Sequence, residues 1–214
     1  MNTIQSALSS LLDDTHTRQI QKGQIMIYEG DHPGEVYILA KGVVKLHDID
    51  EQGNDKILHI LRDWAVMPFA FFSGNDDPTH WFYTALTDCE VYVLRREELQ
   101  NYILAHSNAS TVLMNWFSRE VHELLVRLSS LGKTVTRDKL LVVLRYLAVR
   151  QSDDKGGSWR RVSFAVNQQL LADMIGVTRE SVAITIKELQ NEGFVRHPKV
   201  TVLEVNLAKV QDAI

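Results

Sequence analysis

A glycine at position 176 separates two short amphipathic segments, and this pattern constrains the fold more than any other feature of the sequence. The apolar residues before the glycine are Leu170, Leu171, Met174 and Ile175, and those after it are Val182, Ile186 and Leu189. Both sets have helical spacing. Glycine adopts the positive φ that a tight turn between two helices requires. The pattern therefore predicts two short helices that pack across a tight turn.

Polar residues gather at the start of the second predicted helix. Thr178 is of a type that caps helix N-termini, and Arg179, Glu180 and Ser181 follow it. In a helix-turn-helix, this end of the second helix enters the DNA major groove. Arginine can donate two hydrogen bonds to guanine, and glutamate can accept one from cytosine. The stretch predicts a DNA-binding helix-turn-helix rather than a helical hairpin that binds no DNA, because turn, cap, inner apolar positions and polar tip all agree.

A second pattern lies in the stretch from about Ser110 to Leu131, which is predicted to form one long helix. Apolar residues recur there at alternating steps of three and four, namely Met114, Phe117, Val121, Leu124, Leu128 and Leu131, with Val135 continuing the series. This is the heptad seam of a two-stranded coiled coil, and it predicts a homodimer. The alternative is a helix that buries one stripe in its own domain, and Trp116 and Leu125, which lie off the seam, suit that packing.

The first half of the chain reads as short strands separated by glycines. Strands are predicted at 24–28, 35–40, 43–47, 56–61, 84–86 and 90–94, with a hairpin turn at 51–54. Strands spaced this closely favour a jelly roll or barrel.

Gly132 is expected to end the long helix, and Thr136 or Asp138 is expected to cap the next helix.

Charge is distributed unevenly between the two ends of the chain. Residues 1–136 carry 11 Lys and Arg against 18 Asp and Glu, whereas residues 137–214 carry 12 against 9. DNA binding needs local positive charge rather than a net positive charge of the whole chain, so the C-terminal part is the candidate for DNA binding.

With one cysteine, Cys89, an intrachain disulfide and an all-cysteine iron–sulfur cluster are excluded. No apolar run approaches a membrane span, and no signal sequence precedes residue 24, so a cytoplasmic protein is expected.

The run Gly176-Val177-Thr178-Arg179-Glu180-Ser181-Val182 resembles the recognition-helix signature of the Crp/Fnr family of bacterial transcription regulators. The resemblance extends over nearly the whole chain. It implies the α+β class, with an N-terminal cyclic-nucleotide-binding-like β-roll (jelly roll) over 1–107, a long dimerisation helix and hinge over 108–135, and a winged helix-turn-helix over 136–214. It also implies that Arg179 and Glu180 read bases and that Gln169 contacts phosphate. At Ile184 the cyclic-AMP receptor protein has a further base-reading arginine, so the DNA sequence recognised is expected to differ.

Residues 194–196 and 201–205 read as the strands of the β-wing, with Arg196, His197 and Lys199 expected at its turn, where they could contact phosphates. The alternative for these three is a solvated turn. The predicted DNA contacts are Gln169, Thr178, Arg179, Glu180, Ser181, Lys187, Arg196 and Lys199. As in the family, the expected partners are double-stranded DNA, a second copy of the chain and, as a further candidate, RNA polymerase.

The sensor domain lacks the residues that hold a cyclic nucleotide in the cyclic-AMP receptor protein, where a Gly-Glu pair and an Arg-Ser pair bind ribose and phosphate. The corresponding stretches here are Met67–Phe72 and Pro78–Trp81, without Glu or Arg. Cyclic AMP is therefore not expected as the effector. The aromatic residues of this region either fill the interior of the roll or line a pocket for an apolar or planar ligand such as a fatty acid or haem. The candidate pocket residues are Phe69, Phe72, His80 and Trp81.

An enzyme on a cupin-like barrel is the competing class. That class needs clustered His and carboxylate ligands, or a nucleophile or phosphate motif, and the sequence shows none of these patterns. His47 and His59 could face each other across a hairpin, but two ligands do not make a metal site. Neither a metal nor a resident cofactor is predicted. Cys89, at the start of a predicted strand, is expected to be a buried apolar residue rather than a redox sensor.

Overall fold

The computed structural model describes residues 3–73, 77–152, 156–199 and 201–214. The chain divides into two compact units, one of residues 1–48 and 58–122, the other of residues 49–57 and 123–214. The first unit holds most of the β-roll and the start of a long helix. The second holds the tip of one hairpin, the end of that helix and all following elements.

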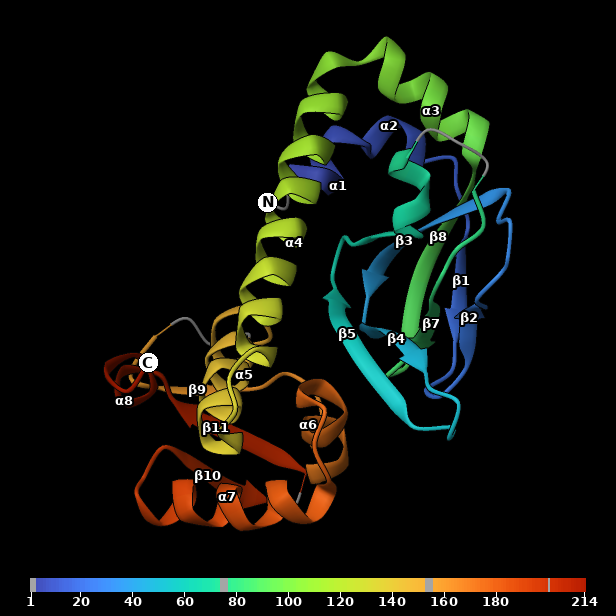
Figure 1. The fold of residues 1–214 in the computed structure, drawn as a ribbon. Coiled ribbons are helices and arrows are strands. Elements are labelled where there is room, and N and C mark those ends of the chain that lie inside the picture. The colour runs from blue at the N-terminus through green and yellow to red at the C-terminus, as the bar shows by residue number, and fades with distance from the viewer. Residues whose placement is uncertain (1–2, 74–76, 153–155, 200) are drawn as a thin grey trace. The chain divides into compact units, whose positions relative to one another are not determined.

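The strands of the roll form two four-stranded sheets (Figure 1). One sheet has the order β1-β8-β3-β6, and the other has the order β2-β7-β4-β5. Their bounds are β1 (Thr17–Ile20), β2 (Ile25–Ile27), β3 (Glu35–Lys41), β4 (Val43–Ile49), β5 (Asp55–Arg62), β6 (Val66–Met67), β7 (Phe82–Ala85) and β8 (Cys89–Arg95). The six strands predicted from the sequence are all present, and Cys89 begins β8 and is buried, as predicted.

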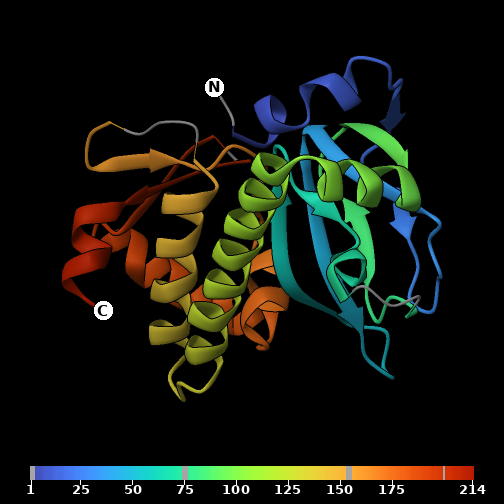
Figure 2. The ribbon, with the colours of Figure 1, turned by 90° about the horizontal axis from the view of Figure 1, so that it is seen from above.

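The core of the roll is apolar and continuous with the first helices. It includes Ile38, Leu46, Tyr83, Val91 and Leu94, which are almost fully buried. Around the strands lie α1 (Thr3–Ala7), α2 (Ser9–Leu12), the 3₁₀ helix η1 (Phe69–Ser73), α3 (Arg96–Ala105) and α4 (Ser107–Leu131). Figure 2 shows α3 and the start of α4 beside the roll from a second direction. Burial of this apolar surface is the main source of the stability of the roll.

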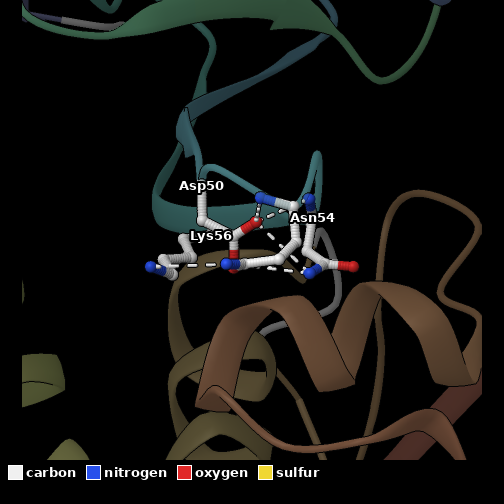
Figure 3. Close-up of polar contacts among 4 residues, drawn as sticks. Asp50, Asn54 and Lys56 are labelled. Carbon is white, nitrogen blue, oxygen red and sulfur yellow. Dashed lines mark hydrogen bonds and ion pairs between the residues drawn. The ribbon is translucent and has the colours of Figure 1, made fainter.

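The turn between β4 and β5 is held by one carboxylate (Figure 3). Asp50 Oδ1 accepts hydrogen bonds from the backbone N–H of Gln52 at 3.0 Å and of Asn54 at 2.9 Å. Lys56 Nζ lies 3.8 Å from Asp50 Oδ2. The backbone hydrogen bond from Asn54 is the largest of the interactions that hold the pKa of Asp50 below its ordinary value. The hairpin predicted at residues 51–54 is therefore confirmed, with Asp50 as its organising residue.

In the second unit, helices pack on a small three-stranded sheet of order β10-β11-β9. The elements are α5 (Thr136–Arg150), β9 (Trp159–Arg161), α6 (Gln168–Ile175), α7 (Arg179–Asn191), β10 (Val195–Lys199), β11 (Val202–Asn206) and α8 (Leu207–Asp212). The expectation that Thr136 or Asp138 caps α5 is wrong, because the N-cap residue is Val135, which makes no side-chain cap. The helix begins at Thr136, before the first residue that either predicted cap would have allowed.

Arg127, near the end of α4, is buried within this second unit. Its Nη2 donates to the backbone carbonyl oxygens of Ile57 at 2.9 Å and Met174 at 3.0 Å, and its guanidinium lies over the ring of Tyr146. Burial lowers the pKa of Arg127 from its ordinary value. One guanidinium thus links the β4–β5 hairpin tip to the end of α6.

Among the described residues, no helix is long and apolar enough to span a membrane.

The turn between β3 and β4 leaves no room for a side chain. Gly42 has a φ of +115°, and a Cβ there would lie 2.6 Å from Cys89 Sγ and 2.8 Å from the Asp88 carbonyl oxygen. Backbone strain and overpacking together predict that Gly42→Ala lowers the free energy of unfolding by about 2–5 kcal/mol. Chemical denaturation measures this change. The control is Gly53→Ala, with a φ of +81° but open space around it, for which about 1 kcal/mol is expected. Equal losses in the two variants would contradict the close-approach argument.

Candidate nucleic-acid interface

Two capped helices and a left-handed turn form the helix-turn-helix. Asn167 Oδ1 accepts from the backbone N–H of Leu170 at 2.7 Å and caps α6. Gly176 ends α6 with φ 66° and ψ 48°, in the left-handed region, as the sequence predicted. Thr178 Oγ1 accepts from the backbone N–H of Ser181 at 3.3 Å and caps α7, again as predicted. These contacts fix where α6 ends and α7 begins.

The predicted inner faces of both helices are buried. In α6 they comprise Leu170, Leu171, Ala172, Met174 and Ile175, and in α7 they comprise Val182, Thr185, Ile186 and Leu189. Thr185 was not among the residues predicted for this face. Its Oγ1 donates to the Ser181 carbonyl oxygen at 3.0 Å, so its hydroxyl is satisfied within the helix.

The opposite side of α7 is exposed and carries most of the predicted DNA contacts. Arg179, Glu180 and Lys187 are exposed, as are Thr178 at the cap and Gln169 on α6. Ser181 is half-buried, and its Oγ lies 2.9 Å from Thr178 Oγ1, so both hydroxyls belong to the cap. Figure 1 shows α7 meeting α6 at its N-terminal end. Thr178, Arg179, Glu180 and Ser181 therefore gather at the N-terminal end of α7, and Lys187 lies about two turns further along the helix.

A groove of about 840 Å³ runs along this side of the second unit. Its polar and charged lining residues are Asn167, Gln168, Gln169, Arg179, Lys187, Gln190 and His197. Three predicted contacts, Gln169, Arg179 and Lys187, are thus brought together. Gln169 Nε2 also donates to Asp173 Oδ1 at 2.7 Å, which orients its amide. Val166, Leu171, Ala183 and Ile186 also line the groove, and its amide and cationic side chains suit a phosphate backbone.

Three polar lining residues of the groove, Asn167, Gln168 and Gln190, were not predicted as DNA contacts, whereas His197 was expected at the wing turn, where it could contact phosphate. Asn167 carried a signal that could have been used, because an Asn before an apolar helical run marks an N-cap. His197 is half-buried, and burial lowers its pKa from the ordinary value. Gln168 and Gln190 had no distinguishing sequence signal.

The wing differs from the prediction at Arg196 and His197. Both lie within β10 rather than at the turn, and Arg196 Nε donates to Glu204 Oε2 at 2.6 Å. Arg161 holds the other carboxylate oxygen of Glu204 from β9, through Nε at 3.1 Å and Nη2 at 3.0 Å. The Arg196 guanidinium also lies 4.3 Å from the ring centroid of Trp159. Arg196 is therefore part of a cluster although it is exposed, and Lys199, at the end of β10, is exposed as well.

This cluster follows from strand register. Glu204 pairs with both Arg161 and Arg196, so the three side chains share one face of the sheet. The cluster borders a second, smaller groove of about 410 Å³. Hydrogen bonds from Arg196 and then Arg161 hold the pKa of Glu204 below its ordinary value. The cluster could not be predicted from the sequence, because β9 has only three residues and was not predicted.

In the roll, the four candidate pocket residues separate into two pairs. Phe69 and Phe72 pack against α4: the Phe72 and Phe117 rings stack with centroids 4.7 Å apart, and Phe69 lies edge-on to Trp116 at 5.9 Å. His80 and Trp81 are exposed and lie edge-to-face, 6.0 Å apart. For Phe69 and Phe72 the contacts agree with the interpretation that they fill the interior.

Each of the two hairpin histidines has a polar side-chain partner on another element. His59 Nε2 lies 2.7 Å from Glu120 Oε2, and both residues are buried between β5 and α4. His47 Nε2 lies 2.8 Å from Thr84 Oγ1. Among the residues that the structure describes, no group of three or more His, Cys, Asp or Glu side chains could hold a metal ion.

Comparison with known families agrees with this architecture. Residues 17–106 match the model of the cyclic nucleotide-binding domain, and residues 139–207 match the model of the Crp-like helix-turn-helix domain. The chain belongs to the Crp/Fnr family. Its two matched domains are those of a Crp/Fnr-type DNA-binding transcription regulator, and the predicted fold class is confirmed.

Individual relatives are distant but extend over most of the chain. The HTH-type transcriptional regulator ArcR of Staphylococcus haemolyticus is 24% identical over 194 residues, 90% of this chain and 83% of that protein. The CRP-like cAMP-activated global transcriptional regulator of Mycobacterium tuberculosis is 24% identical over 192 residues, 89% and 84%. The structure of a cyclic nucleotide-binding domain containing protein from Listeria monocytogenes has a TM-score of 0.81 at 15% identity, covering 97% of this chain and 99% of its own.

The Glu204 cluster predicts an acid-sensitive contribution to the stability of the wing. Because the pKa of Glu204 is lowered in the folded state, its stabilisation is present above the ordinary glutamate pKa and is lost as pH falls through the folded value. Glu204→Gln should lower the free energy of unfolding by about 1–3 kcal/mol at neutral pH. Urea denaturation should show this difference shrinking between about pH 5 and pH 3. The control is Asp212→Asn, which changes an exposed carboxylate at the end of α8. A difference that grows on acidification would contradict the assignment.

Proposed function

We propose that this regulator acts as a homodimer that places α7 of each protomer in successive major grooves, about 34 Å apart, of a near-palindromic DNA site. The observation that carries the proposal is the geometry of the motif. Capped helices bury one side of α7 and leave Arg179, Glu180 and Lys187 exposed beside a groove lined by amides and cations.

Within this proposal, the residues divide between reading bases and holding the backbone. Arg179 donates to guanine and Glu180 accepts from cytosine, since both are exposed in the first turn of α7. Gln169, Lys187 and His197 line the groove, and exposed Lys199 extends from β10, so these four contact phosphates. Thr178 and Ser181 set the start of α7, and the N–H groups of its first turn favour a phosphate there. Arg196 acts indirectly, because Glu204 and Trp159 already hold it in the sheet.

The dimer part of the proposal rests on the exposed apolar side of α4. Met114, Val121, Leu128 and Leu131 of the predicted seam are exposed, whereas Phe117 and Leu124 are half-buried. Leu125, expected to pack inside the protomer, is exposed and joins this side, while Trp116 is buried as expected. Val135 lies beyond the end of α4 and is not part of the helical seam. The exposed apolar residues Met114, Val121 and Leu128 recur every seven positions, which is the row that a second copy of α4 would cover.

For regulation, we propose that cyclic AMP is not the effector. Residues 66–73 contain neither a carboxylate nor a guanidinium, and Phe69 and Phe72 of this segment contact Trp116 and Phe117 instead of leaving a polar site. Any effector would have to prefer one of two states of the dimer, with residues 132–136 as the hinge. RNA polymerase is proposed as a partner of the DNA-bound protein.

We propose no enzymatic role for the chain, because the family consists of transcription regulators.

Selection of bound duplexes from a random DNA pool tests the central proposal. The wild type should enrich a two-fold symmetric site, and Arg179→Ala should bind that site about 5- to 150-fold more weakly because a paired hydrogen bond to guanine is lost. The matched control is Arg95→Ala, which removes an exposed arginine of the roll and should bind as the wild type does. Equal binding by both variants, or no enriched sequence for any of the three, would contradict the proposal.

The dimer is tested separately by sedimentation. Leu128, 63% exposed on α4, is replaced by glutamate, and Leu104, 84% exposed on α3, receives the same change as a control. Leu128→Glu should convert the dimer to a monomer at micromolar concentration, because two charges would meet at one seam. Leu104→Glu should remain dimeric. A wild type that sediments as a monomer, or a dimeric Leu128→Glu variant, would overturn this part.

A further inference from the structure

Ile184 is an apolar residue in the middle of the exposed side of α7. It is 64% exposed, whereas the other aliphatic residues of this helix longer than alanine, Val182, Ile186 and Leu189, are buried. Isoleucine is a weaker helix former than alanine or leucine, so an exposed position gains nothing in local stability from it. Neither the core of the second unit nor helix propensity explains why isoleucine stands here.

The neighbours of Ile184 on the helix surface are polar and exposed. Glu180 lies four residues before it and Lys187 three residues after it, so the three side chains follow one another along a single side. This side is opposite the buried row of Val182, Thr185 and Leu189. If Glu180 faces the base edges, as the proposed function holds, then Ile184 faces the same groove one helical turn further on.

The major groove offers one apolar group to such a side chain. Donors and acceptors line the edges of all four bases there, and only thymine adds a methyl group, at C5. An aliphatic side chain cannot pair with the polar edges, but it can cover this methyl and remove it from water. The chemistry therefore selects thymine.

We propose that Ile184 is a specificity-determining residue that reads the 5-methyl group of a thymine in each half-site. Four residues of helix correspond to about 6 Å, or about two base pairs, so this thymine lies about two base pairs from the pair contacted by Glu180. The inference rests on the proposed function, since it requires α7 to lie in the major groove. It adds to that function an apolar element of sequence recognition.

Replacing one methyl group tests the inference directly. The probe is the duplex selected by the wild type, in which each thymine of the half-site is replaced in turn by deoxyuridine, which differs only by the missing methyl. At one position the wild type should bind about 3- to 5-fold more weakly, the loss expected for one buried methyl. The Ile184→Ala variant should bind thymine and uracil duplexes equally at that position. A circular dichroism spectrum and Tm like those of the wild type establish that the variant is folded.

A second variant checks the same position by exchange of chemistry. Ile184→Arg should change the preferred pair there from T·A to G·C in a repeated selection, because arginine pairs with guanine. If selection yields a symmetric site that depends on Arg179 but no uracil position separates the wild type from Ile184→Ala, this inference is wrong and the proposed function stands. If no duplex is selected at all, both are wrong.

Discussion

The left-handed turn at Gly176, between two capped helices, is the constraint on which the recognition surface depends. Because Gly176 ends α6 in the left-handed conformation and Thr178 caps the start of α7, the turn between the two helices has a defined length. The side of α7 that packs on the core is thereby determined, and so is the side left exposed. Arg179, Glu180, Ile184 and Lys187 are on the exposed side as a consequence of this turn and not of any contact they make themselves.

Polar side chains elsewhere in the second unit support this surface. Glu204 holds Arg161 and Arg196 on one face of the small sheet, which stiffens the wing next to the groove that His197 lines. Arg127 ties the end of α6, at the Met174 carbonyl, to the β4–β5 hairpin tip. Both clusters use guanidinium groups whose fixed fork of donors suits bridging between strands or carbonyl groups.

The elements with strong periodicity could be predicted from the sequence, and those without it could not. The α6–α7 motif and the long helix α4 follow from apolar spacing, and the roll follows from short strands between glycines. The Glu204 cluster, the His59–Glu120 contact and the cap of α5 depend on which residues meet in space, which a linear pattern does not contain. Arg196 illustrates the difference: its position near the wing was predictable, but its engagement by Glu204 required the register of β10 and β11.

The spacing of the two half-sites offers the most direct test of the central claim, that two copies of this chain read DNA through paired α7 helices. The measurement is the affinity of the full-length protein for its selected duplex, compared with the same duplex carrying about five extra base pairs at its centre, half a helical turn. Binding should fall to the level of a single half-site, because the second half-site then faces the opposite side of the DNA. Unchanged affinity for the lengthened duplex would contradict it.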